Sequence, residues 1–187
     1  MNVVPTKLKD AYILEPRLFH DERGYFMESY NARVLEQFGI LGDFIQDNQS
    51  LSMPAGTLRG LHFQQNPMAQ TKIVRCVSGA IYDVIVDIRR GSPTYGEWIG
   101  VYLTADNHQQ LVVPKGFAHG FCTLAPNTIV TYKVDEYYCA KSDGGIAWDD
   151  PDLGIDWPIT DPFLSSKDSV LPKLKDAVMN FIYEEEM

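Results

Sequence analysis

The chain of 187 residues has little of what marks several large classes of protein. Its three cysteines, Cys76, Cys122 and Cys139, are widely spaced and form no CxxC pair, which favours reduced thiols in a cytoplasmic protein. No run of about eighteen apolar residues occurs, so no membrane-spanning helix is expected. The formal net charge of -9 argues against a broad surface for nucleic acid or anionic membrane, although a few convergent Arg and Lys side chains can still bind a small anion.

Internal repeats, low-complexity tracts and flexible linkers are also missing, so we expect one domain over residues 1–187. The first ten residues lack an apolar run after their basic residues, so no signal peptide is expected. Aromatic residues, in contrast, are plentiful, with 10 Tyr, 9 Phe and 3 Trp. That supply suits a β-rich core or a stacking site.

Short alternating segments predict β-strands. Residues 72–77 and 80–88 flank Ser78-Gly79, a turn signal, and together predict a hairpin. Within the second of these segments, Asp83 and Asp87 share one face of the strand and apolar side chains line the other.

Similar patterns follow along the chain. Residues 110–113 and 117–124 flank a Pro-Lys-Gly turn, and 129–136 alternates with Tyr132 on its apolar side. Helices are predicted only at 32–38 and around 173–178. The Pro- and Asp-rich segment 149–161 is expected to be an ordered loop anchored by two tryptophans, Trp148 and Trp157. The pattern predicts an all-β sandwich or barrel with a few short peripheral helices.

Two histidines stand at a spacing typical of the cupin superfamily, whose fold is a small jelly-roll barrel. Gly56 precedes His62 by six residues, and Pro114-x-Gly116-x-x-His119 follows about fifty residues later. Metal-binding cupins place a second His and then a Glu after the first, but this chain has Gln64 and no Glu there. Because a transition-metal site needs at least three protein ligands, no metal is expected, and both imidazoles are free for acid–base work inside the barrel.

Basic residues lie in the same neighbourhoods. Arg59 lies just before His62, Lys72 begins a predicted strand, and Arg23 precedes a glycine. Each alone is typical of a solvated surface. A charge beside an inward-facing strand is easier to explain if a phosphate or carboxylate meets it.

Longer segments resemble those of the dTDP-4-dehydrorhamnose 3,5-epimerase family in order and spacing. The resemblance covers about residues 19–168 and is carried by Phe19-His20-Asp21-Glu22-Arg23-Gly24-Tyr25-Phe26, Gln46-Asp47-Asn48-Gln49-Ser50, Leu58-Arg59-Gly60-Leu61-His62-Phe63-Gln64, Pro114-Lys115-Gly116-Phe117-Ala118-His119-Gly120-Phe121, Tyr132-Lys133-Val134-Asp135, Gly144-Gly145-Ile146, Trp148-Asp149-Asp150-Pro151 and Ser166-Lys167-Asp168. It implies a cupin-type jelly roll and a cofactor-independent isomerase. The expected reaction converts dTDP-4-keto-6-deoxy-D-glucose to dTDP-4-keto-L-rhamnose, for dTDP-rhamnose biosynthesis, by proton transfer at C3 and C5 beside the C4 ketone.

The resemblance also implies residue roles. His62 is expected to be the base, with Asp168 fixing its tautomer, and Tyr132 the acid on the opposite face. Lys72, helped by His119, is expected to stabilise the enolate oxygen. Further positions are implied to bind the nucleotide sugar: Arg23 and Arg59 the diphosphate; Glu28, Gln46 and Asn48 the base or sugar; Tyr138 the thymine ring by stacking; and Asp143 and Lys167 further ligand groups. Family members are homodimers that exchange N-terminal strands, so a homodimer is expected.

Five alternatives remain open from the sequence. The chain could be an epimerase acting at C3 or C5 alone, or could use another nucleotide such as CDP. It could be a 3,4-ketoisomerase of the same sugar, although Tyr132 with Asp168 favours the epimerase. A non-catalytic sugar-binding cupin predicts the loss of one acid–base residue. A metal-dependent cupin dioxygenase predicts more metal ligands than the chain offers.

Overall fold

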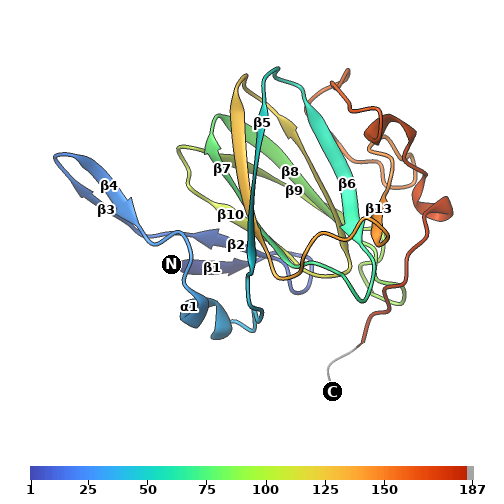
Figure 1. The fold of residues 1–187 in the computed structure, drawn as a ribbon, viewed down its shortest axis with the longest axis horizontal. Coiled ribbons are helices and arrows are strands. Elements are labelled where there is room, and N and C mark those ends of the chain that lie inside the picture. Colours follow the sequence, from blue (N-terminus) through green and yellow to red (C-terminus); the bar gives the residue numbers. More distant parts are fainter. Residues whose placement is uncertain (185–187) are drawn as a thin grey trace.

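The computed structural model describes residues 1–184, in which two antiparallel β-sheets face each other as the main layers (Figure 1). One sheet has six strands in the spatial order β1 (Asn2–Pro5), β2 (Tyr12–Glu15), β10 (Gln110–Val113), β7 (Lys72–Ser78), β12 (Thr128–Val134) and β5 (Gln46–Ser52). The other has five, in the order β13 (Asp143–Gly145), β6 (Leu58–Gln64), β11 (Phe117–Thr123), β8 (Ala80–Asp87) and β9 (Trp98–Thr104). The predicted all-β sandwich is confirmed.

The remaining elements are short. Strands β3 (Leu18–Asp21) and β4 (Gly24–Met27) form a separate hairpin that projects from the body (Figure 1). Helix α1 (Ala32–Glu36) follows, and Asn31 caps it by accepting a hydrogen bond from the backbone N–H of Val34. Two single turns of 3₁₀-helix cover Asp168–Val170 and Leu174–Asp176. The predicted short helices are therefore present, and no described helix is long and apolar enough to cross a membrane.

The predicted hairpin of residues 72–77 and 80–88 is wrong, because β7 and β8 belong to different sheets. Gly79, with φ +80°, turns the chain from one sheet to the other. A Cβ there would lie 2.4 Å from Oγ1 of Thr128, so only glycine fits this corner. The turn signal was correct, but a corner between sheets has the same local sequence as a hairpin. Strands β10 and β11 are likewise joined by a turn and lie in different sheets.

Three apolar clusters hold the layers together. The first fills the space between the two sheets and includes Val74, Ile85, Phe117, Phe121 and Val130. A second packs the outer face of the five-stranded sheet against the C-terminal segment, and a third packs the six-stranded sheet against α1. Each fully buried large side chain contributes about 1.5–3 kcal/mol to the free energy of unfolding.

Segment 149–161 is an ordered loop, as predicted. Trp157 is buried, and its indole N–H donates to the backbone carbonyl of Trp148 over 2.9 Å. This contact holds the loop against the five-stranded sheet, whose outer face shares a cluster with both rings.

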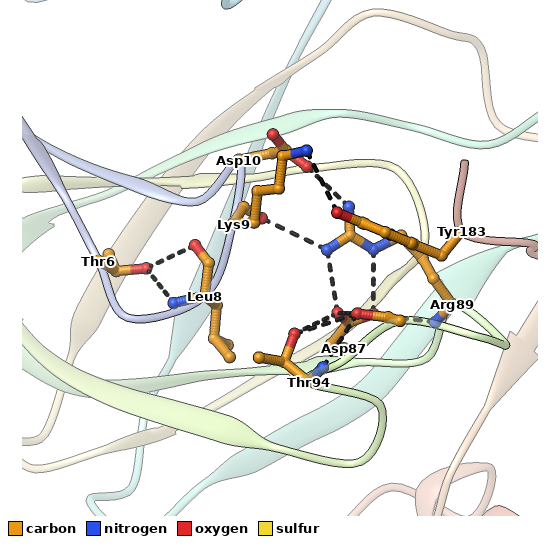
Figure 2. A network of polar contacts seen from close by, with 9 residues as sticks. Thr6, Leu8, Lys9, Asp10, Asp87, Arg89, Thr94 and Tyr183 are labelled. Carbon is orange, nitrogen blue, oxygen red and sulfur yellow. Dashed lines mark hydrogen bonds and ion pairs between the residues drawn. The ribbon is translucent and has the colours of Figure 1, made fainter. Parts of the chain in front are cut away.

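A polar network closes the end of β8 (Figure 2). Asp87 is fully buried and accepts hydrogen bonds from Arg89, Ser92 and Thr94. Arg89 also donates to Asp10 over 2.7 Å and stacks on the ring of Tyr183 (Figure 2). Both charges are thus paired, and the network ties an N-terminal turn and the C-terminal segment to one strand.

Candidate active site

A pocket of about 240 Å³ is lined by side chains from both sheets. Its lining comprises Ser50, Arg59, His62, Lys72, His119, Phe121, Tyr132, Ser165, Lys167 and Asp168. A second pocket of about 220 Å³ shares His62, Lys72, Tyr132 and Lys167 with the first, so the two adjoin. The second extends toward Gln46, Asn48, Tyr138 and Asp143. Eleven of the thirteen site residues expected from the sequence therefore line these two pockets.

His62 and Asp168 form a hydrogen-bonded pair at the pocket wall. His62 lies on β6, and its Nε2 is 2.5 Å from Oδ1 of Asp168, whose side chain is only 4% exposed. An ionised carboxylate only accepts, so Nε2 carries a proton, and in the neutral form of the ring Nδ1 holds the free lone pair. Burial alone raises the pKa of Asp168, but the hydrogen bond and charge of His62, with a backbone N–H from Gly60, hold that pKa below its ordinary value.

Close approach of β6 and β11 brings the two histidines side by side. His62 and His119 are direct cross-strand partners, and the register shifts by a bulge just after His119. A Cβ on Gly60 would lie 2.6 Å from Cα of Gly120 and 2.7 Å from the carbonyl oxygen of His119. Glycine at residue 60, with φ +119°, is therefore what lets these strands meet beside the pocket.

His119 has its own carboxylate partner, which the sequence did not reveal as a site residue. Asp83 on β8 is fully buried, and its Oδ1 lies 2.6 Å from Nε2 of His119. The predicted face shared by Asp83 and Asp87 is correct, but the two residues serve different purposes. Asp87 belongs to the network in Figure 2, while Asp83 contacts a pocket residue.

Tyr132 and Lys72 enter the pocket from the opposite, six-stranded sheet. Alternation along β12 places Tyr132 on the same face as Val130, so the ring extends the buried core into the pocket. Burial raises the pKa of Tyr132, and the nearby charge of Arg59 opposes this only in part. Burial lowers the pKa of Lys72 to about 8, against attraction from Asp83 and Asp143. The site thus pairs two imidazoles on one sheet with a phenol and an amine on the other.

Polar side chains extend the site along the second pocket. Gln46 donates to Oδ1 of Asn48 over 2.8 Å, and both point inward from β5. The hydroxyl of Tyr138 donates to Asp143, which also forms an ion pair with Lys167. The ring of Tyr138 is 62% exposed, so a flat ligand group has room to stack on it. Deeper in the site, Arg59 donates to Ser52 and to the Leu51 carbonyl and keeps its charge at the pocket wall.

Comparison with known proteins decides the family. A family model described as dTDP-4-dehydrorhamnose 3,5-epimerase matches residues 5–176. Enzymes of that name from Shigella flexneri and Escherichia coli K12 are 49% and 50% identical, over 95% of this chain and 98% and 97% of their own lengths. The chain belongs to the dTDP-4-dehydrorhamnose 3,5-epimerase family.

Solved structures agree with this assignment. The Bacillus anthracis 3,5-epimerase, crystallised with TDP and PPi, is 61% identical with a TM-score of 0.90, over 92% of this chain and 98% of that one. The Legionella pneumophila enzyme in complex with dTDP-4-keto-L-rhamnose is 44% identical with a TM-score of 0.89, over 94% and 93%. The predicted cupin-type fold, the isomerase class and 3,5-epimerisation, rather than the alternatives, are confirmed.

Two residues that the family resemblance assigns to the ligand lie elsewhere in the described chain. Arg23, on the turn of the β3–β4 hairpin, forms an ion pair with Asp21 and is not among the pocket residues. Glu28 follows the hairpin, is exposed and accepts a hydrogen bond from Asn31. The hairpin projects away from the sheet that carries β6 (Figure 1). In a single chain these two side chains do not line either pocket, so their ligand contacts stay predictions.

Metal ligation was not expected for this 3,5-epimerase family member. Within residues 1–184, no group of three or more His, Cys, Asp and Glu side chains is arranged to hold a metal ion. Each pocket histidine is instead engaged by one aspartate.

Proposed function

We propose that the chain, in the cytoplasm, epimerises dTDP-4-keto-6-deoxy-D-glucose at C3 and C5 with His62 as base and Tyr132 as acid. One observation supports these roles: the two side chains come from opposing sheets and line the same pocket. A group held between them has an imidazole on one side and a phenol on the other, as inversion of a carbon centre requires. The three free cysteines support the cytoplasmic location.

The proposed chemistry moves one proton at a time. Nδ1 of His62 takes the proton from a carbon beside the C4 ketone, and the C–H electron pair becomes an enolate on the ketone oxygen. Tyr132 then donates its hydroxyl proton to the opposite face of that carbon, and the imidazolium and phenolate return to their resting forms by exchange with solvent. Asp168 stabilises the imidazolium through the 2.5 Å contact. Lys72 and His119 neutralise the developing oxyanion, at about 3 kcal/mol per donor.

Nucleotide recognition is proposed for the second pocket. Tyr138 stacks on the thymine ring, Gln46 and Asn48 contact base or sugar, and the Asp143–Lys167 pair binds further ligand groups. Arg59 binds the diphosphate from the wall of the first pocket. Bound TDP and dTDP-4-keto-L-rhamnose in two related enzymes support a dTDP-linked ligand.

A homodimer is proposed to complete the site. Strands β1 and β2 pair within the chain's own six-stranded sheet, so the exchanged element is the β3–β4 hairpin. Its aromatic side chains Phe19, Tyr25 and Phe26 are 49%, 50% and 67% exposed, which is unusual unless another surface covers them. Delivery of Arg23 and Glu28 to the partner's pocket accounts for both their position and their expected role.

The experiment that tests the chemistry is incubation with dTDP-4-keto-6-deoxy-D-glucose in D₂O, followed by NMR of the hexose ring. Wild type is expected to exchange and invert both C3 and C5. His62→Ala is expected to lose exchange at both carbons, and Tyr132→Phe to exchange at one carbon while failing to invert C5. Near-native exchange by His62→Ala refutes the base assignment, and exchange at a single carbon in wild type indicates a single-site epimerase.

Mixing two impaired variants tests the dimer, with turnover measured at substrate concentrations far below KM, where loss of a binding contact also lowers the rate. Consider a dimer of one Arg23→Ala chain and one His62→Ala chain. If Arg23 acts in the partner's pocket, both defects fall in the same pocket and the other pocket is intact. Refolding a one-to-one mixture then restores about a quarter of the wild-type sites, because half the dimers are mixed and each has one intact pocket. A mixture no more active than the separate variants refutes the exchange.

A further inference from the structure

A second histidine–aspartate pair lies inside the sandwich, beside the one assigned to proton abstraction. Asp83 approaches Nε2 of His119 at 2.6 Å and is fully buried. Because its carboxylate can only accept, this contact places a proton on Nε2 of His119 and fixes the ring in the pocket wall. Asp83 itself is not a lining residue of either pocket, so it acts through its neighbours.

The other oxygen of the same carboxylate has no hydrogen-bond donor. Oδ2 of Asp83 is buried and unpartnered among the residues that the structure describes. A buried ionised oxygen is costly unless a positive charge or a donor compensates it. Lys72 lies on the facing sheet. Among the charged groups, Asp83 does most to favour the ammonium form of Lys72.

The remaining charges near Lys72 do not replace Asp83. Asp143 also attracts the ammonium group, but it already forms an ion pair with Lys167, whose own charge repels Lys72. The other titratable or charged side chains that line the same pockets are His62, His119, Arg59, Tyr132, Tyr138 and Asp168. Of these, Asp168 is engaged by His62. Asp83 is therefore the carboxylate left to balance Lys72.

We propose that Asp83 is a positioning residue that acts on two side chains: its Oδ1 orients His119, and its Oδ2 supplies the negative charge that keeps Lys72 an ammonium ion. This rests on the proposed function, in which Lys72 and His119 meet the developing enolate oxygen. A single buried charge thereby prepares both donors before substrate arrives, so no reorganisation is needed when the enolate forms. Its removal leaves the amine buried without compensation, and the amine then sheds its proton at lower pH.

The test is Asp83→Asn, with the pH at which Lys72 loses its proton as the main readout. Acetylation of free wild-type and variant protein by N-hydroxysuccinimidyl acetate, followed by peptide mass spectrometry, reports the fraction of neutral amine at each pH. We expect the midpoint for Lys72 to lie near pH 8 in wild type, and roughly one pH unit or more lower in Asp83→Asn. The alkaline limb of kcat should move in the same direction, while the Kd for dTDP stays unchanged.

Asp87→Asn is the matched control, because Asp87 is an equally buried carboxylate on the same face of the same strand. Its partners are those in Figure 2, so its loss should lower the free energy of unfolding without moving the Lys72 midpoint. Identical Lys72 midpoints in wild type and Asp83→Asn overturn the proposal. So does an equal shift in Asp87→Asn.

Two further measurements separate the possible failures. The ring ¹⁵N spectrum of wild type, assigned with a His119→Asn variant, must show His119 protonated on Nε2, and an unprotonated Nε2 overturns the proposal even if Asp83→Asn does not fold. Acetylation and ¹⁵N spectra need no substrate. If wild type fails to epimerise but these readouts behave as expected, the proposed function fails while the assignment of Asp83 stands.

Discussion

Replacing Asp168 by Asn isolates the charge behind the base. The amide has nearly the same size, so the packing of a side chain that is 4% exposed is retained while its charge is lost. In the reaction, His62 becomes an imidazolium beside this carboxylate. Two unit charges about 4 Å apart, at an effective dielectric constant of about 20, attract by about 4 kcal/mol. Since about 1.36 kcal/mol changes a rate tenfold, we expect kcat to fall by roughly 10³-fold.

The assay is deuterium uptake at C3 and C5 together with kcat, both at pH 7, and the Kd for dTDP should stay within a few-fold of wild type. Asp150→Asn is a suitable control, because Asp150 is 2% exposed and accepts backbone N–H groups from Asp152 and Leu174 away from the pockets. This control should be less stable yet fully active. A folded Asp168→Asn variant with kcat within tenfold of wild type refutes the assigned role.

The same substitution has a signature in folding stability. The pKa of Asp168 is lowered in the folded chain, so the unfolded state binds more protons in the acid range. Its contribution to the free energy of unfolding is complete above pH 4 or so and is lost as pH falls through the folded-state pKa. The stability difference between wild type and Asp168→Asn should therefore shrink on acidification in denaturant titrations. A difference that grows toward low pH contradicts the paired carboxylate.

Two other substitutions have opposite expected effects on stability. Lys72→Met should raise the free energy of unfolding by about 3 kcal/mol below pH 8, because the folded-state pKa of about 8 lies below the ordinary 10.5 and charging the buried amine is costly. The same substitution should lower kcat about 100-fold. An unchanged thermal midpoint contradicts the expected gain in stability. Gly60→Ala should cost about 3 kcal/mol in denaturant titrations and abolish turnover, because its Cβ overlaps Gly120. Gly91→Ala, with φ +89° but nothing within 4 Å, should cost about 1 kcal/mol and stay active; equal effects at both glycines refute the close approach.

Strand alternation explains why much of the site was predictable. Period two along β11 and β12 puts His119 and Tyr132 on faces whose other members are core residues, and that is visible in the sequence. Which strands share a sheet is not visible, because a turn such as Ser78-Gly79 serves a hairpin or a corner equally well. The face of each side chain was therefore predicted, while the pairing of β7 and β8 was not.

Asp83 was missed because its partner is remote in sequence. Asp87 finds donors two, five and seven residues away, in Arg89, Ser92 and Thr94. Asp83 has no hydrogen-bonding neighbour of this kind, and its partner His119 lies 36 residues along the chain. An Asp in the middle of a mainly apolar strand, with no local donor, is nevertheless a usable signal, since such a carboxylate needs a distant compensating group.

The surroundings of the hairpin residues could not be predicted from the sequence for a different reason. The faces of β6 and β12 are set by one chain's own register, whereas the surroundings of Arg23 and Glu28 depend on what covers the projecting β3–β4 hairpin. Acid–base chemistry and diphosphate binding are then separable in the proposed dimer. The His62–Asp168 pair is complete within one chain, so loss of the partner hairpin should weaken nucleotide affinity and raise KM with little effect on the proton-transfer groups. Dissociation and His62→Ala thus act on different steps, because one removes a binding contact and the other removes the base.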